Sequence, residues 1–295
     1  MQNEVKQQIT QKLREYCDRH ESQNKAANSL QGVSSATVSQ MLNENWDLIK
    51  PEMWRNVASQ VGYKSKEWVY VETTDYKIIN RLLQDAQANS NVFAMTGDAG
   101  SGKSKSFDMY VSNNKSAYLL SCAEYWNRKE FLVQLLTVMG VDYSGFTVAE
   151  MMNEIVKKLK STQMPLIILD EADKLPDTVL YFFITLYNRL EDHCGIIMCA
   201  TDHLSKRINK GIKLNRKGYK EINSRIGRKF IELKGVNYTD VMQICIANGI
   251  DANLTIEVES SKGKVKKNAI KHIFDDSEND LRRVCRKIHS IKNQK

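Results

Sequence analysis

A glycine-rich run that directly follows a short apolar stretch constrains this chain more than any other feature. Residues 97–104 read GDAGSGKS and match the pattern G-x-x-x-x-G-K-[ST], and Val92–Met95 before them are typical of a buried strand. Glycines let successive backbone N–H groups turn inward around a phosphate. Lys103 would reach the β- and γ-phosphates and Ser104 would ligate Mg²⁺, whereas a Gly/Ser-rich surface turn is the alternative. The predicted phosphate-binding residues are Gly97, Asp98, Ala99, Gly100, Ser101, Gly102, Lys103 and Ser104.

Two adjacent carboxylates further along the chain supply the second half of such a site. Leu166–Leu169 is an apolar run too short for a helix, so it indicates another buried strand, which delivers Asp170 and Glu171 at its end. Ligands of open α/β sheets collect at the carboxyl ends of strands. We expect Asp170 to hold the Mg²⁺ shell and Glu171 to polarise the attacking water. An acidic pair at a helix N-terminus is the alternative.

Composition places the chain among ordinary globular proteins. It has 295 residues, of which 42% are hydrophobic and 26% charged, enough for one large domain and a small one. No apolar run approaches membrane-spanning length, and the start of the chain is polar, so we expect a cytoplasmic protein with no membrane partner. The six cysteines form no C-x-x-C pair, so we expect reduced, structural thiols and no zinc site.

Positive charge is concentrated at one end of the chain. Residues 1–202 carry 21 Lys and Arg against 25 Asp and Glu, whereas residues 203–295 carry 22 against 10. The densest stretch runs from Lys206 to Lys220 with no acid inside it. This asymmetry favours a polyanion partner and makes Lys206, Arg207 and Lys210 candidate DNA contacts, although a solvated loop would look similar.

The first 65 residues are typical of small helices. Residues 23–43 resemble the helix-turn-helix of the repressor-like family, with Gly32 in the turn and Ser34 capping the second helix. Ser35, Thr37 and Gln40 would then point outward and reach phosphates or base edges. The turn is one residue longer than usual, which puts sequence-specific readout in doubt. A small helical bundle that docks a protein is the alternative.

From residue 75 onward, helix-like and strand-like stretches alternate. The five predicted strands cover residues 91–96, 117–121, 166–169, 195–200 and 229–233. Strands separated by helices predict an α/β fold with a doubly wound parallel sheet, and the segment after Tyr238 is expected to form a mainly helical lid. The expected domains are residues 1–65, 66–236 and 237–295.

The order of these motifs resembles the AAA+ ATPases, and more narrowly the transposition regulators typified by the phage Mu B protein, with TnsC and IstB as more distant relatives. The resemblance covers nearly the whole chain, including the run Asp170–Leu175. It implies a P-loop AAA+ sheet flanked by helices with a small helical lid, preceded by an all-α helix-turn-helix domain, with ATP and Mg²⁺ as cofactors. A polar sensor residue that positions water in such ATPases matches Thr201, for which a helix N-cap is the alternative.

Three arginines match catalytic positions of the same ATPases. Arg225, with Arg228 as second choice, would be the finger that reaches the nucleotide of a neighbouring subunit and makes hydrolysis depend on assembly. Arg282 matches the lid arginine that contacts the γ-phosphate, whereas Arg283 is expected to face elsewhere. Exposed arginines beside a strand are the alternative for the first two.

The resemblance also implies DNA contacts. Relatives of this class line the interior of a filament with residues just after the second strand, where Arg128 and Lys129 stand here. A cation at a helix start opposes the helix dipole, which favours an external anion. The basic residues of 257–267 indicate an insertion in the lid for which the family offers no counterpart.

These features together predict an ATPase that assembles into rings or helical filaments on double-stranded DNA and delivers that DNA to a transposase, with hydrolysis driving disassembly. One alternative is a helicase or replication-initiator loader with the same ATPase core. The other is an ATP-responsive helix-turn-helix transcription regulator, against which the longer turn and the lack of a clear dimerisation element count.

Overall fold

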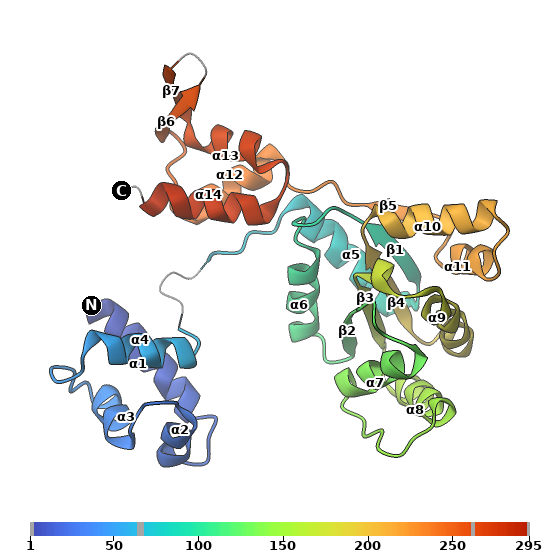
Figure 1. Cartoon of the computed structure of the whole chain (residues 1–295), viewed down its shortest axis with the longest axis horizontal. Coiled ribbons are helices and arrows are strands. Elements are labelled where there is room, and N and C mark those ends of the chain that lie inside the picture. The colour runs from blue at the N-terminus through green and yellow to red at the C-terminus, as the bar shows by residue number, and fades with distance from the viewer. Residues whose placement is uncertain (1–2, 64–67, 261–262, 294–295) are drawn as a thin grey trace. The chain divides into compact units, whose positions relative to one another are not determined.

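Two units, Met1–Val69 and Tyr70–Lys295, each carry a hydrophobic core of their own. The structure is a computed structural model that describes residues 3–63, 68–260 and 263–293 (Figure 1). Each unit is described by itself below.

The first unit is built of four helices within its described residues, and small helices are what the sequence predicts for this segment. They are α1 Asn3–Cys17, α2 Gln23–Ser29, α3 Ser35–Leu42 and α4 Pro51–Gln60. Ser34 caps α3 by accepting a hydrogen bond from the Thr37 backbone N–H at 3.1 Å, and Gly32 takes a φ of 68° in the turn. Val38 and Met41 of α3 are fully buried beside Trp54 of α4. The inner face of α3 is therefore the one that carries its apolar residues.

The second unit is organised around five parallel strands in the order β2-β3-β4-β1-β5. Their bounds are β1 Val92–Thr96, β2 Ala117–Ser121, β3 Leu166–Asp170, β4 Gly195–Ala200 and β5 Phe230–Glu232. β3 and β4 are buried along their whole length, which explains their continuous apolar sequences. Because β4 lies between β1 and β3, the ends of these three strands meet at one edge of the sheet.

Helices cover both faces of this sheet (Figure 1). One face packs against α5 Thr74–Asn89 and α6 Lys103–Asn113, and the other against α7 Arg128–Val138, α8 Val148–Ser161 and α9 Asp177–Leu190. A short 3₁₀ helix, η1 Ala172–Lys174, follows β3. α10 Asp202–Lys213 and α11 Tyr219–Arg225 pack beside α9. The predicted α/β sheet flanked by helices is therefore confirmed.

The lid consists of three helices and a hairpin. The helices are α12 Tyr238–Ala247, α13 Ala269–Ser277 and α14 Leu281–Asn293, and the hairpin pairs β6 Thr255–Ser260 with β7 Gly263–Asn268. The sequence predicted a mainly helical lid with a basic insertion, and the hairpin occupies that insertion. Alternation of apolar and charged residues from Ile256 to Glu259 has the period of two that favours a strand over a helix.

Two buried carboxylates fasten the lid to the start of α5. Asp75 accepts a hydrogen bond from the backbone N–H of Gly235 at 2.7 Å, and Asp240 accepts one from the backbone N–H of Thr74 at 2.9 Å. Burial raises the pKa of Asp75, and the backbone donors partly offset that rise. The junction between β5 and α12 is therefore held at fixed points rather than left as a free linker.

Candidate nucleotide-binding site

The phosphate-loop residues form a tight turn between β1 and α6. Gly100 and Gly102 have φ angles of 86° and 88°, a region that only glycine enters without strain. The Lys103 ammonium group donates hydrogen bonds to the carbonyl oxygens of Gly97 and Asp98, both at 2.7 Å, and to the Ser101 hydroxyl at 3.3 Å. The loop thus holds its cation against its own backbone, where phosphate oxygens of a nucleotide would bind.

The end of β3 brings the first carboxylate of the acidic pair to the start of α6. The Ser104 hydroxyl donates to Asp170 at 2.6 Å, and the Glu171 backbone N–H donates to the other oxygen of Asp170 at 2.9 Å. Asp170 is 2% exposed, and this burial raises its pKa despite the Ser104 hydrogen bond. The structure therefore places the two predicted Mg²⁺ ligands in direct contact, although they stand far apart in the sequence.

This donor set fits Mg²⁺ in particular. A hydroxyl and one carboxylate are hard oxygen ligands, and Mg²⁺ in nucleotide sites is held by one or two such groups together with substrate phosphates. No cluster of three or more His, Cys, Asp or Glu side chains suited to a metal occurs among residues 3–63, 68–260 and 263–293. The metal would therefore depend on the nucleotide for the rest of its shell.

The second carboxylate is engaged by a neighbouring lysine. Glu171 has a φ of 55°, an unusual value for a residue with a side chain, and its carboxylate accepts a hydrogen bond from the Lys174 ammonium group at 2.7 Å. The pair is about half exposed, so water weakens the attraction. One oxygen of the Glu171 carboxylate is therefore engaged by Lys174 in this structure.

Thr201 stands directly after β4, at the N-cap position of α10. Its hydroxyl makes no capping hydrogen bond and donates instead to the Asp173 carboxylate at 2.6 Å. The side chain therefore points to the segment that follows the acidic pair, and its role as a sensor stays a prediction.

The lid meets the phosphate loop through the start of α14. The Leu281 backbone N–H donates to the Gly100 carbonyl at 2.9 Å, and a Cβ atom on Gly100 would lie 2.0 Å from a carboxylate oxygen of Asp280. A glycine is thus needed at position 100 for two reasons: it lets Asp280 approach the loop closely, and it adopts the positive φ angle. Arg282 follows Leu281 and is exposed, whereas Arg283 pairs with Glu278.

The two candidate finger arginines differ in their surroundings. Arg225 ends α11, and its guanidinium carbon lies 5.0 Å from the centre of the Tyr187 ring. Its Nε atom is buried without a hydrogen-bond partner among the described residues. Arg228 is exposed and has a φ of 60°. Sequence patterns do not predict the contact between Arg225 and Tyr187, since the two residues lie on different helices.

The candidate DNA contacts fall into two groups. Arg128 and Lys129 are exposed in the first turn of α7, which is capped by Asn127. Tyr125, which sequence reasoning missed, is 74% exposed just before them. On α3 of the first unit, Ser35 is exposed, Thr37 contacts the Ser34 hydroxyl at 2.9 Å, and Gln40 is half-buried.

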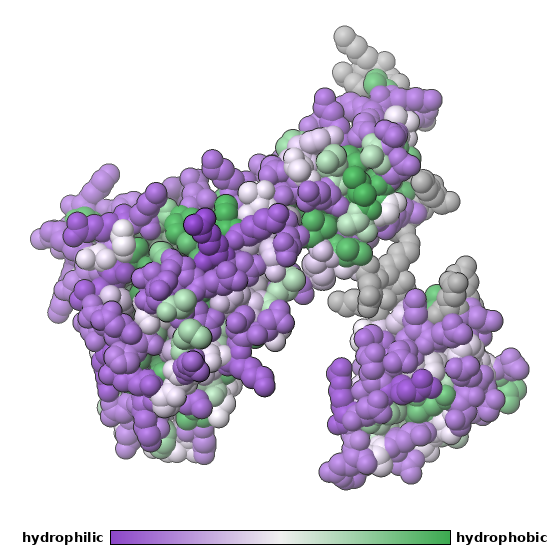
Figure 2. All heavy atoms as spheres, turned by 180° about the vertical axis from the view of Figure 1, so that it is seen from behind, coloured by the Kyte–Doolittle hydropathy of each residue, from purple (hydrophilic) through white to green (hydrophobic). Residues whose placement is uncertain are grey.

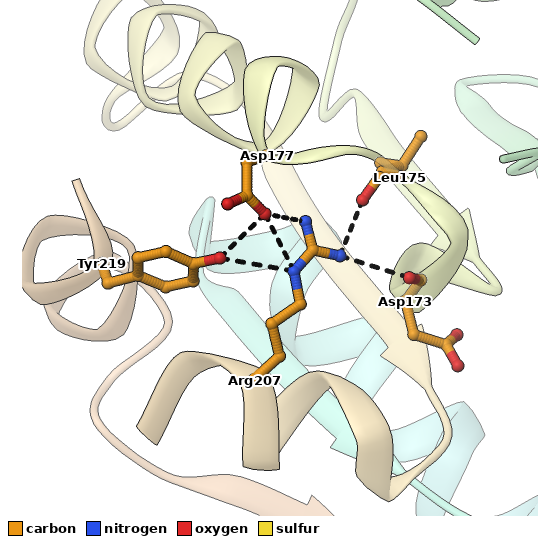
Figure 3. A network of polar contacts seen from close by, with 5 residues as sticks. All are labelled: Asp173, Leu175, Asp177, Arg207 and Tyr219. Carbon is orange, nitrogen blue, oxygen red and sulfur yellow. Dashed lines mark hydrogen bonds and ion pairs between the residues drawn. The ribbon is translucent and has the colours of Figure 1, made fainter. Parts of the chain in front are cut away.

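The basic stretch on α10 and α11 needs one correction. Lys206 is exposed and pairs with Asp202, and Lys210 is exposed with no ion pair within the described residues. Arg207 instead turns inward to Asp177 (Figure 3), because the helical period places it on the side of α10 that faces α9. Its guanidinium group is occupied by the protein itself, so Arg207 is removed from the predicted DNA surface.

The cysteines are free thiols, and most of them are buried. All six are free thiols, and Cys122, Cys194, Cys199 and Cys245 are buried. Burial raises the pKa of Cys194 to about 12, so its thiol stays protonated and unreactive at neutral pH.

Within the described part of the chain, no helix combines the length and the apolar character needed to cross a membrane.

Comparison with known proteins agrees with this site. Residues 86–208 match the family model described as AAA domain, a range that includes the phosphate loop, the acidic pair and Thr201. No curated protein matches the chain. The parallel five-stranded sheet with its flanking helices fits the α/β fold of P-loop AAA+ proteins. The match supports an AAA domain over residues 86–208, which is less than half of the chain.

Proposed function

We propose that this chain binds Mg-ATP, assembles on double-stranded DNA in rings or helical filaments, and delivers that DNA to a transposase. The observation that carries the nucleotide part is the contact between Ser104 and Asp170 at 2.6 Å, beside a loop that holds Lys103. A serine after the loop lysine and a carboxylate at a strand end are what a Mg-nucleotide requires. The transposition part is supported by the motif order of the whole chain.

Hydrolysis would use the residues at the ends of β3 and β4. Bound Mg²⁺ neutralises charge on the transferred phosphoryl group, and Ser104 and Asp170 would hold it. Glu171, once released from Lys174, would accept a hydrogen bond from the attacking water and orient it toward the γ-phosphate. Thr201 would fix Asp173 and with it the turn that carries Glu171.

A neighbouring subunit would complete the site. Arg225, or Arg228 in its place, would bring a guanidinium group to the γ-phosphate of the next protomer, where it offsets developing negative charge. Nucleotide binding that occurs only between subunits would stabilise the assembly, and hydrolysis would release it. The partly buried position of Arg225 on Tyr187 supports a defined starting place for that side chain.

DNA contact would be mostly to phosphates, through Arg128, Lys129, Lys206 and Lys210. Exposed lysines and arginines bind the duplex backbone with little sequence preference and strong dependence on salt. The face of the molecule in Figure 2 is mainly hydrophilic, with hydrophobic side chains gathered in a few patches, which suits a polar partner. Ser35, Thr37 and Gln40 of the first unit would add contacts to phosphates or base edges.

The decisive experiment is the ATPase rate with and without random-sequence DNA over a range of protein concentrations, joined to electron microscopy of the same samples. We expect the rate per subunit to rise with concentration and with DNA, and continuous filaments or stacked rings to form only with ATP. Equal coating of DNA without nucleotide would overturn the proposal. Discrete small rings would favour the loader, and binding confined to one site would favour the regulator.

A further inference from the structure

Arg207 joins three separate segments of the second unit (Figure 3). From α10, its Nε atom donates to the Asp177 carboxylate at 3.0 Å, and Nη2 makes a second contact to the same oxygen. Its Nη1 atom donates to the carbonyl oxygens of Leu175 at 2.8 Å and Asp173 at 3.3 Å. Every acceptor except the hydroxyl of Tyr219, at 3.3 Å, belongs to the segment that follows the acidic pair.

Tyr219 extends this network to the first residue of α11. Its hydroxyl donates to Asp177 at 2.8 Å, and its ring packs edge-on against Tyr181 of α9 with centroids 5.8 Å apart. A Cβ atom on Gly211 of α10 would lie 2.4 Å from the Tyr219 ring, so glycine there lets the ring lie on the helix. Tyr219 is 1% exposed. α11 is thus fixed to both α9 and α10 at its N-terminal end.

The other end of α11 carries Arg225, which also contacts α9. Its guanidinium group lies over Tyr187, while Tyr219 at the start of the helix is bonded to Asp177 on the same α9. α11 therefore rests on α9 at both ends, and Arg207 anchors the end nearer to the acidic pair. A shift of Arg207 would move the helix that carries the candidate finger.

Electrostatics agree with a permanently charged network. Burial alone would raise the pKa of Asp177, but the hydrogen bonds from Tyr219 and Arg207 outweigh it and hold that pKa below its ordinary value. Asp177 is therefore ionised at neutral pH, and Arg207 faces a full negative charge.

We propose that Arg207 is a positioning residue that sets the place of α11, and through it of Arg225, so that a subunit offers its finger correctly to the next protomer. This inference rests on the proposed function, because it requires hydrolysis to be completed in trans. The planar guanidinium fork alone reaches a carboxylate and two carbonyls at once, which a lysine ammonium group cannot.

The test uses the full-length chain with Arg207→Lys, assayed with Mg-ATP and DNA. We expect kcat to fall about tenfold while the KM for ATP stays unchanged, since small misplacements of a catalytic group cost rate rather than ground-state binding. The variant is then mixed with a large excess of Glu171→Gln subunits, which have intact fingers and whose own slow turnover is measured separately and subtracted. Under the proposal, the rate per Arg207→Lys subunit returns to that of wild-type protein in the same excess.

Two controls make the outcomes distinct. Arg225→Ala in the same excess of Glu171→Gln tests the finger itself, and its rescue supports the proposed function. If Arg225→Ala is rescued and Arg207→Lys is not, Arg207 acts inside its own site and this inference is wrong. If neither is rescued, the finger assignment fails and the inference fails with it. Tyr219→Phe keeps the ring packing and removes the hydroxyl, and with it the bonds to Asp177 and Arg207, so it repeats the test if Arg207→Lys does not fold.

Discussion

Lys103 and Arg207 are both cations held by several oxygen acceptors, but the acceptors come from very different places. Those of Lys103 lie within six positions of it, on Gly97, Asp98 and Ser101. Those of Arg207 lie 12 to 34 positions away. The position of Lys103 can be predicted from a short sequence motif, because its acceptors lie in the same loop. The position of Arg207 cannot, because its acceptors come together only when the helices pack. The role of a basic residue therefore depends on whether its partners are close in sequence.

The local site is tested most strongly at Glu171, the proposed catalytic carboxylate. Glu171→Gln keeps the shape of the side chain and removes its ability to accept a proton, so we expect kcat to fall by about 10²–10⁴. Nucleotide affinity should stay the same, because Asp170, Ser104 and Lys103 are untouched. The rate of phosphate release and the equilibrium binding of a fluorescent ATP analogue measure the two effects.

Lys174→Gln is the matched control for loss of the Glu171 ion pair. An exposed pair contributes about 0.2–1 kcal/mol, so this variant should change kcat less than about fivefold. A Glu171→Gln variant with normal turnover, or a Lys174→Gln variant as impaired as it, would remove Glu171 from its assigned role.

Lys103→Ala probes the loop that holds its own cation. A charged donor to phosphate contributes about 1.5–3 kcal/mol, so we expect the affinity for ATP to fall about tenfold to a hundredfold and assembly on DNA to be lost with it. Calorimetric titration with ATP measures the affinity. The melting temperature without nucleotide is the control for folding, because Lys103 also donates to Gly97, Asp98 and Ser101 of the loop itself. Unchanged affinity would contradict the assignment of the loop.

Sequence reasoning succeeded where geometry is dictated locally. The spacing of Gly97 to Ser104 requires one loop shape, and short apolar runs between polar residues leave little choice but buried strands, so the sheet and the meeting of Ser104 with Asp170 were predicted. The inward orientation of Arg207 could not be predicted, because a run of basic residues does not show which side of its helix packs against the protein. The hairpin of β6 and β7 was not predicted, because the apolar and charged residues alternate over only four positions, 256–259, in a segment otherwise rich in lysine.

The basic helix α10 offers a direct comparison of two neighbouring cations. Lys210 is exposed, so Lys210→Gln should weaken DNA binding and reduce the slope of log affinity against log salt by about 0.9, the value for one phosphate contact. Arg207→Lys should leave that slope unchanged, because Arg207 faces Asp177. Fluorescence anisotropy with a labelled duplex and a non-hydrolysable ATP analogue measures both.

Lys115→Gln is the control for removal of an exposed lysine just before β2, at the opposite edge of the sheet, and its slope should equal that of wild type. An Arg207→Lys slope lower by as much as the Lys210→Gln slope would restore Arg207 to the DNA surface.

The smallest expected effect concerns the cost of burying Asp170. Burial raises its pKa, so between the unfolded and folded values the folded protein binds more protons, and the free energy of unfolding falls as the pH rises through that window. Asp170→Asn removes this penalty and should raise the melting temperature of nucleotide-free protein at neutral pH by about 2–4 °C, corresponding to about 1 kcal/mol. The same variant should lose Mg²⁺-dependent turnover. Thermal unfolding from pH 4 to pH 8 measures the gain, which must shrink in acid, where Asp170 is protonated in both states. A gain that does not depend on pH would mean that better packing, rather than relief of a buried charge, stabilises the variant.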